Sequence, residues 1–434
     1  MGVTALKHLL KNGTIINPAA GQKAAGDVLF EDGKILSVGE TITATDGVEV
    51  IDVTDCYVTP GLIDMHVHLR EPGQEAKESM TTGTQAAAAG GFTRVATMAN
   101  TTPVIDDLVT FNGVKERARA EGRVKVDIIG AVSQNLEGRV LSDMGDLALA
   151  GAVAFSDDGH YVESADFMRR AMEYADTYGK MIIDHAEDWT MAAQGFMHEG
   201  KVSTALGVVG RPRAAEDIAV ARDILLAEMT GAHIHIAHVS SAHAVELIRA
   251  AKQRGVRVTC EVTAHHLALT DAEIKNYDAA FKVAPPLREE DDRQALLAAL
   301  ADGTIDAIVT DHSPHADEEK DVPFCCAPNG MSGLETSLAA VITYALTPGH
   351  IDWERLVDAM SVQPARLLQR EAGVLKAGAP ADITVIAPQS QWTVEPEKLY
   401  TKSLFSPFAG KTLTGRAVQT WVDGEQVMRE GAVR

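Results

Sequence analysis

Short apolar runs alternate with longer amphipathic segments between about residue 62 and residue 311. The runs have the length and β-branched content of buried strands, and the segments between them carry one apolar stripe, as helices do. Strands that alternate with helices form parallel sheets, and eight units in series suit closure, so we predict an α/β fold with a (β/α)₈ barrel. The predicted strands are residues 62–68, 92–98, 124–131, 152–156, 181–185, 233–239, 256–262 and 305–311. The predicted helices are residues 78–89, 107–120, 164–178, 214–229, 242–254 and 291–301.

Both ends of the chain have a different pattern, made of short strands separated by turns. The sequences around Asp32-Gly33 and Asp423-Gly424 are typical of hairpin turns between such strands. Neither end has enough strands for a core of its own, so we expect the two ends to pair into one small β-sandwich domain beside the barrel. The expected division is 1–60 and 366–434 for the two parts of the small domain, and 61–365 for the barrel.

Composition limits the kinds of molecule that the protein is expected to bind and the compartment in which it is expected to work. A formal net charge of −22 over 434 residues argues against nucleic-acid and anionic-membrane surfaces, which need basic patches. The four cysteines lack zinc-ribbon spacing and are too few to cross-link a chain of this length, which favours a reduced, intracellular protein. The first eleven residues lack the apolar core of a secretory leader, and no run of 18 apolar residues follows. We therefore expect a cytoplasmic location.

Two histidines end the first predicted barrel strand. Alternation along an extended strand places His66 and His68 on one face, so both imidazoles can reach a single point. Pro72 and Gly73 then stop the strand, which puts the pair at its C-terminal end, where barrel enzymes carry their chemistry. The pair alone leaves two interpretations open, a metal site and a hydrogen-bonded pair of core residues.

Other predicted strands also end in histidine or aspartate, and the C-terminal ends of parallel strands meet at one mouth. Imidazoles and carboxylates without thiolates are ligands that suit Zn²⁺, and the set is large enough for two ions that share a carboxylate. Two cations near one water would lower its pKa and supply a hydroxide nucleophile, which predicts a hydrolase. Spacing alone leaves open whether Asp157 or Asp158 is the shared carboxylate. The residues at these strand ends are His66, His68, Asp157, Asp158, His185, His238 and Asp311.

The remaining histidines are assigned from their local pattern. Alternation puts His233 and His235 on the face opposite His238, which favours core or helix-facing positions. His265 and His266 end the seventh strand without an evident ligand partner and stay unassigned. The three expected at the surface, in loop or helix settings, are His160, His198 and His243.

Several motifs together resemble type I dihydroorotases of the cyclic amidohydrolase superfamily, and the resemblance covers nearly the whole chain. The motifs are HVHLREPG at 66–73, NT at 100–101, FSDDG at 155–159, HVSSA at 238–242, PPLR at 285–288, DHSPH at 311–315 and GLET at 333–336. The resemblance implies an amidohydrolase-type barrel and the zinc-dependent interconversion of N-carbamoyl-L-aspartate and L-dihydroorotate in pyrimidine synthesis.

The resemblance also implies roles for individual residues. His66 and His68 would bind one zinc and His185 and His238 the other. Asp158 would bridge them where related amidohydrolases use a carboxylated lysine, and residues 151–161 contain no lysine. Asp311 would bind the first zinc and carry the proton. The substrate carboxylate would be bound by Arg70, Asn100 and His315, and the planar fork of Arg70 suits that task better than a lysine.

Some positions depart from the family's usual pattern. Ala99 and Ala264 stand where proline is usual, Ala284 stands where an asparagine usually contacts substrate, and Asn329 replaces an aromatic residue. The polar segment 317–329 is expected to be a mobile loop over the mouth.

Two alternatives remain, together with open questions of assembly. Hydantoinases, dihydropyrimidinases and allantoinases share the barrel, but would carry the lysine bridge and lack the arginine that Arg70 provides. A non-catalytic scaffold for aspartate transcarbamoylase would have lost ligands, whereas this chain keeps all six. Besides the small-molecule substrate, a homodimer and an aspartate transcarbamoylase partner are the open assemblies, and whether one or both zinc positions are filled also stays open.

Overall fold

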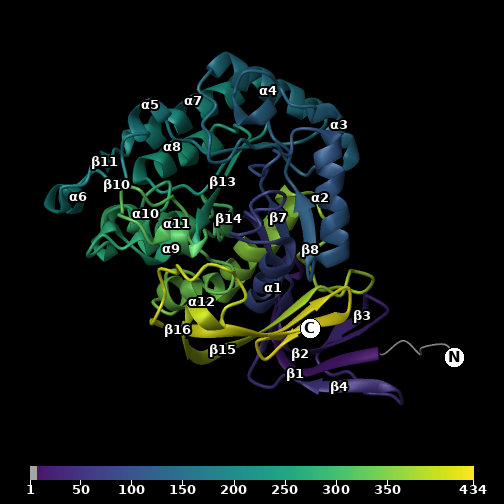
Figure 1. The fold of residues 1–434 in the computed structure, drawn as a ribbon. Helices are drawn as coiled ribbons and strands as arrows, with labels where there is room; N and C mark the ends of the chain where they lie inside the picture. The colour runs from purple at the N-terminus through teal and green to yellow at the C-terminus, as the bar shows by residue number, and fades with distance from the viewer. Residues whose placement is uncertain (1–6) are drawn as a thin grey trace.

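The computed structural model describes residues 7–434, and the barrel forms its larger part. The first six residues, which belong to the expected N-terminal part of the small domain and to the stretch examined for a leader, lie outside the described residues. Figure 1 shows the barrel above a sheet in which the purple start and the yellow end of the chain lie together. The barrel strands are β6 (Leu62–Val67), β7 (Phe92–Thr97), β8 (Lys125–Ile128), β9 (Ile182–Asp184), β12 (Ile234–Ile236), β13 (Val258–Thr263) and β14 (Ala307–Val309).

Parallel pairing runs from β6 through β7 to β8, and from β9 through β12 and β13 to β14. The predicted fourth strand, residues 152–156, joins the two groups but is regular only at Phe155, which bridges to Gly130 on one side and to Ile182 on the other. A bridge between Val67 and His312 closes the ring. The sequence therefore predicted all eight positions, and one of them is an irregular strand.

The six predicted helices all form, within two residues of the expected ends. Their starts are fixed by side chains that accept backbone N–H groups: Asp107 caps α2 and Ser164 caps α4. The six are α1 (Met80–Gly90), α2 (Leu108–Glu121), α4 (Ala165–Thr177), α7 (Ala214–Thr230), α8 (Ala242–Gln253) and α10 (Glu290–Ala301). Shorter elements are α3 (Met144–Ala150), α5 (Trp189–Ala192), α6 (Lys201–Leu206), α9 (Ala264–Ala268), α11 (Asp317–Lys320), α12 (Ser337–Val341), α13 (Trp353–Val357), α14 (Gln363–Leu367), β10 (Met197–His198) and β11 (Gly210–Arg211).

Both chain ends contribute to one nine-stranded sheet, as predicted. Its centre is the antiparallel pairing of β5 with β15, which joins the start of the chain to its end. Asp32 and Gly33 both have positive φ in the turn between β2 and β3, the conformation that the Asp-Gly pair predicts. The strands are β1 (Lys7–Asn17), β2 (Gln22–Glu31), β3 (Lys34–Gly39), β4 (Val48–Asp52), β5 (Tyr57–Pro60), β15 (Ile383–Thr393), β16 (Thr412–Val422), β17 (Glu425–Arg429) and β18 (Ala432–Val433). The expected domain boundaries themselves stay a prediction.

Apolar side chains fill the lower part of the barrel and polar ones its mouth. Ile63, Met65, Ala96 and Ile183 belong to one buried cluster inside the ring. The histidines and aspartates follow these residues along the chain, so a packed apolar floor supports the polar groups. Among the described residues, no helix is long and apolar enough to cross a membrane.

Candidate metal centre and active site

His66 and His68 lie at the end of β6 and are buried. The Nε2 atom of His66 lies 3.5 Å from Oδ1 of Asp158 and 3.6 Å from Oδ1 of Asp311. The Nε2 atom of His68 lies 3.4 Å from Oδ2 of Asp158 and 3.2 Å from Oδ1 of Asp311. Two imidazoles from one strand and two carboxylates from distant strands thus enclose one point.

A second group shares Asp158 with the first. The Nδ1 atom of His185 lies 3.6 Å from Oδ1 of Asp158, and Nε2 of His238 lies 3.5 Å from the same oxygen. The cluster thus contains two sets of three residues, each of which could hold a metal ion, and Asp158 belongs to both sets. Asp157 points elsewhere, because its carboxylate accepts hydrogen bonds from Ser133 and from the Val132 N–H. The geometry therefore places Asp158, rather than Asp157, between the histidines.

A further shell of hydrogen bonds orients the imidazole rings. Nδ1 of His66 lies 2.6 Å from Oε1 of Glu261, and Nδ1 of His68 lies 2.9 Å from Oδ1 of Asn100. When Nδ1 carries the proton and donates it, Nε2 presents its lone pair to the cluster, the form in which histidine binds metals. Nε2 of His185 likewise contacts Glu187, at 3.2 Å, which leaves Nδ1 facing Asp158.

The charges of the cluster fit a cation. Burial alone would lower the pKa of His185, but Asp158 and Glu187 raise it to about 10. Burial would raise the pKa of Asp158, but His66, His185 and His238 hold it well below its usual value. Without a metal ion, protonated histidines such as His185 would therefore supply the positive charge that balances Asp158. Nε2 of His66 and Oδ1 of Asp158 are buried and have no hydrogen-bond partner, so the residues fit a shared metal ion.

A hollow of about 220 Å³ opens beside the cluster, and all three residues expected to contact substrate line it. Arg70 donates from Nη2 to Ser313 Oγ at 2.7 Å and from Nε to the Pro314 carbonyl at 3.1 Å. Burial lowers the pKa of Arg70 to about 10, so it stays cationic at neutral pH. Asn100 donates to the Asp158 carbonyl, at 3.3 Å. Nε2 of His315 lies 2.9 Å from the Asn329 carbonyl oxygen.

Two of the family departures border the same hollow. Ala284 and Asn329 both line it, next to Val283 and Gly330. An alanine cannot supply the side-chain amide that the family usually places there, whereas Asn329 contributes its backbone carbonyl to His315. The segment 317–329 contains the short helix α11 and reaches the hollow at Asn329, and its mobility stays a prediction.

The structure corrects two expectations about histidines and adds two residues. His198 is buried beside Arg288 rather than exposed, because it lies in β10, which pairs with β11. His235 is buried, as expected, but it does not lie on the face opposite His238. It contacts Glu261, which also contacts His66. Sequence reasoning missed Glu261 and Glu187, although a single carboxylate within the buried strand β13 was a signal for Glu261.

Of the remaining histidines, His160 and His243 are exposed as expected, and His233 is half-buried beside Thr259. His266 bonds to Thr263, and the ring of its neighbour His265 packs 4.7 Å away. Nε2 of His265 is buried without a hydrogen-bond partner, and burial lowers the pKa of this imidazole to about 4.

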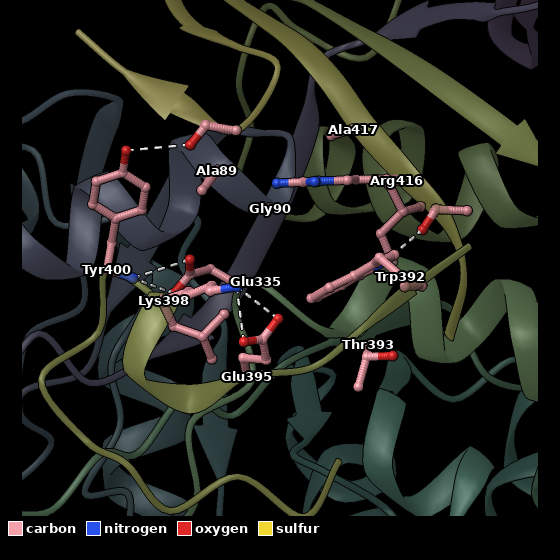
Figure 2. Close-up of a pocket in the computed structure, with 15 residues that line it drawn as sticks. Ala89, Gly90, Glu335, Trp392, Thr393, Glu395, Lys398, Tyr400, Arg416 and Ala417 are labelled. Carbon is pink, nitrogen blue, oxygen red and sulfur yellow. Dashed lines mark hydrogen bonds and ion pairs between the residues drawn. The ribbon is translucent and has the colours of Figure 1, made fainter. Parts of the chain in front are cut away.

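A second hollow, of about 270 Å³, lies between the barrel and the terminal sheet, where Figure 2 shows Glu335, Trp392, Tyr400 and Arg416. No histidine or cysteine lines it. Glu335 accepts hydrogen bonds from the backbone of Tyr400, and Glu395 pairs with Lys398. Arg416 lies 5.6 Å from the centre of the Trp392 ring, and the hollow lacks the ligand set found at the barrel mouth.

Comparisons with solved structures confirm the predicted fold class. An L-hydantoinase (dihydropyrimidinase) from Arthrobacter aurescens superposes with a TM-score of 0.89 at 28% identity, covering 98% of this chain and 97% of that one. A dihydropyrimidinase from Brevibacillus agri superposes with a TM-score of 0.87 at 26% identity, covering 99% of this chain and 96% of that one. Both are amidohydrolases with a (β/α)₈ barrel, so the superpositions support the predicted barrel fold.

Sequence comparisons identify the branch. A dihydro-orotase-like family model matches residues 56–244. A dihydroorotase of Geotalea daltonii is 49% identical over 418 residues, which are 96% of this chain and 98% of the relative. A dihydroorotase of Pelotomaculum thermopropionicum is 49% identical over 429 residues, which are 99% of this chain and all of the relative. At this identity over nearly the full length, the chain belongs to the dihydroorotase family.

Proposed function

We propose that the chain interconverts N-carbamoyl-L-aspartate and L-dihydroorotate, the ring-closing step of pyrimidine synthesis, at a pair of zinc ions in the barrel mouth. The convergence of two histidine pairs on Asp158, beside a hollow that contains Arg70, carries this proposal. The relatives named dihydroorotase support the reaction, and the cluster supports a metal-dependent cyclic amide hydrolase.

The donor set supports zinc in particular. It consists of imidazole nitrogens and carboxylate oxygens, with no thiolate, and it is large enough for two ions that share Asp158. When bound, the ions would polarise the ring carbonyl and make a water acidic enough to react at neutral pH. His66, His68 and Asp311 would hold one ion, and His185 and His238 the other.

Asp311 is the residue that moves the proton in this proposal. Its carboxylate lies 3.2 Å from Nε2 of His68 and borders the hollow. In the hydrolytic direction Asp311 takes a proton from the attacking water and passes it to the ring nitrogen as the amide bond breaks. In the ring-closing direction Asp311 starts protonated, so ring closure is favoured at lower pH.

Arg70, Asn100 and His315 bind the substrate carboxylate and orient the ring. Ser313 and Pro314 fix the guanidinium of Arg70, so its fork is already organised when the carboxylate arrives. Asn100 links this group to the metal cluster, because it also bonds to His68. The Asn100–His68 contact therefore connects the residues proposed to bind the substrate carboxylate with those proposed to bind metal.

The alternatives fit less well. Hydantoinase-type relatives would be expected to carry a lysine bridge, and the bridging position here is Asp158. A scaffold that has lost its activity would be expected to lose ligands, yet all six predicted ligand residues lie together at the mouth. A cytoplasmic location, and assembly as a homodimer or with aspartate transcarbamoylase, belong to this proposal as expectations from the sequence.

Metal analysis of the purified protein, combined with an ultraviolet assay on L-dihydroorotate, hydantoin and allantoin, tests the proposal. We expect zinc in the preparation and hydrolysis of L-dihydroorotate in preference to the other two rings. Turnover of hydantoin without turnover of dihydroorotate would refute the proposed substrate. A preparation that is fully loaded with zinc but inactive on all three rings would instead support the scaffold.

A further inference from the structure

Two buried lysines lie behind the wall of the catalytic hollow, at the segment expected to be a mobile loop. Lys320, the last residue of α11, is 1% exposed, and Lys282 is 4% exposed. Among residues 7–434, no ion pair joins either ammonium group to a carboxylate. A buried ammonium is costly unless other groups replace its water, so the partners of these lysines show what they do.

The partners are backbone carbonyls of a single segment. Nζ of Lys282 donates to the carbonyls of Phe324 at 2.7 Å, Ala327 at 2.5 Å and Cys325 at 3.3 Å. It also lies 4.8 Å from the centre of the Phe196 ring, which adds a cation–π contact. The ammonium therefore gathers residues 324–327 into a compact turn around itself.

Lys320 performs the same task for the next stretch of the segment. Its Nζ donates to the carbonyls of Gly330 at 2.7 Å and Pro328 at 3.1 Å. Burial and the neighbouring charge of Lys282 lower the pKa of Lys320 to about 7. Together the two lysines contact five of the seven carbonyls of residues 324–330.

This stretch ends at the wall of the catalytic hollow. Asn329 and Gly330 line the hollow, and the Asn329 carbonyl contacts His315. The Gly330 N–H donates to the Lys282 carbonyl at 2.9 Å, and Val283 and Ala284, which follow Lys282, line the hollow as well. A Cβ atom on Gly330 would lie 2.5 Å from the Ser313 carbonyl oxygen, so the segment fits closely against the strand end that carries Asp311 and His315.

We propose that Lys282 and Lys320 are positioning residues that hold segment 324–330 closed against the catalytic hollow, through its backbone carbonyls, and so form the wall against which the substrate binds. This inference rests on the proposed function for the identity of the substrate. Neither lysine contacts the metal cluster, so their removal loosens the wall without removing a ligand. Interactions made equally in the ground state and the transition state change KM rather than kcat.

The test uses Lys320→Met and Lys282→Met, which remove the charge and keep an unbranched side chain. Lys275→Met is the matched control, because Lys275 is exposed in the loop before Lys282. We expect each buried variant to raise KM for L-dihydroorotate at least tenfold, with kcat within about threefold and metal content unchanged. Amide hydrogen exchange of peptides covering 324–330 should become faster in both variants, and should not change in Lys275→Met.

The outcomes separate the two proposals. If both buried variants keep KM and exchange rates within twofold of Lys275→Met, the positioning role is wrong. A loss of kcat and metal content with unchanged KM overturns it too. If one variant fails to fold, the other decides. If the unaltered enzyme does not turn over dihydroorotate, the proposed function fails, while hydrogen exchange still tests the pinned segment by itself.

Discussion

Glu261 illustrates how one side chain outside the ligand set shapes the metal centre. Both of its oxygens are used, one by Nδ1 of His66 at 2.6 Å and the other by Nε2 of His235 at 3.1 Å. A carboxylate on the far side of a metal-binding imidazole fixes the ring and makes its free nitrogen more basic. Burial would raise the pKa of Glu261, but the two histidines lower it to about 2, so it is ionised at neutral pH.

We therefore expect Glu261→Gln to weaken metal binding by about 10- to 100-fold, because the amide keeps the shape of the side chain but removes its charge. Competition with a zinc-selective chelator measures the change. Glu216→Gln provides a control, since Glu216 is an equally buried carboxylate that contacts Arg288 and Ser240. Equal metal affinity in Glu261→Gln and the unaltered enzyme would contradict the role assigned to Glu261.

The proposed function gives Asp311 two roles, metal binding and proton transfer, that a single substitution can separate. Asp311→Asn keeps an oxygen near His68 but cannot accept and return a proton. We expect most of the metal to remain and turnover to fall by at least a thousandfold. Metal content and the initial rate on L-dihydroorotate, measured on the same preparation, check this. A near-normal rate would remove Asp311 from proton transfer.

Backbone conformation explains which site residues the sequence could predict. The spacing of His66 and His68 predicted a shared point, and the structure brings both imidazoles to Asp158. Arg70, His238 and Asp311 have φ values of 61°, 32° and 45°, so none is in a regular strand. Alternation along a strand does not extend through such residues, which is why the face of His235 relative to His238 was predicted incorrectly.

At the scale of elements, the helices were the most predictable parts, since their caps are local. Asp107 and Ser164 mark starts in the sequence that the structure reproduces. Residues 152–156 were harder, because their pairing with Gly130 and Ile182 depends on the twist of neighbouring strands rather than on their own residues. The conformation of residues 324–330 was also out of reach, since their carbonyls accept hydrogen bonds from Lys282, more than 40 residues earlier in the chain, and from Lys320.

Glu335 connects the barrel to the segment that returns toward the terminal sheet, and its ionisation should be visible in stability. Its carboxylate accepts the N–H groups of Tyr400 and Thr401 beside the hollow of Figure 2. Burial raises the pKa of Glu335 from 4.5 to about 7. The folded state therefore binds this proton more tightly than the unfolded state, so this contribution is largest below pH 4.5 and is lost as pH rises toward 7.

Glu335→Gln should abolish that loss. Between pH 5 and pH 8, the free energy of unfolding of the unaltered enzyme should fall by about 2 kcal/mol more than that of the variant, as urea titrations would show. Glu395→Gln alters an exposed carboxylate at the rim of the same hollow and should follow the unaltered enzyme. Parallel pH curves for Glu335→Gln and the unaltered enzyme would show that Glu335 is already ionised at pH 5.

For the whole molecule, the sequence predicted the joining of both chain ends because neither end could bury a core alone. The structure shows the reason in β5 and β15, which pair although more than 300 residues separate them. The formal charge of −22 belongs to the chain as a whole, while the catalytic hollow holds the buried cation Arg70 with the buried lysines behind its wall. An anionic substrate is thus attracted by the site rather than by the molecule as a whole.

The proposed metal centre would also link distant parts of the barrel, and this should make the stability of the fold dependent on the metal. Its predicted ligands lie at the C-terminal ends of β6, residues 152–156, β9, β12 and β14. Two metal ions that share Asp158 would therefore connect five strand ends. A ligand that binds only the folded state stabilises it by about 4 kcal/mol when its free concentration is 1,000 times Kd. Removing the metal with a chelator should therefore lower Tm by several degrees, and adding zinc should restore it.

Asp158→Asn provides the decisive comparison, because Asp158 is the residue that both ion positions share. The variant should unfold near the Tm of the chelated enzyme, and chelator should not lower its Tm further, since little metal remains to be removed. Asp157→Asn should still respond to chelator, because Asp157 bonds to Ser133 and the Val132 N–H instead of facing the histidines. If chelation abolishes activity but leaves the Tm of the unaltered enzyme unchanged, the metal serves the chemistry without stabilising the barrel.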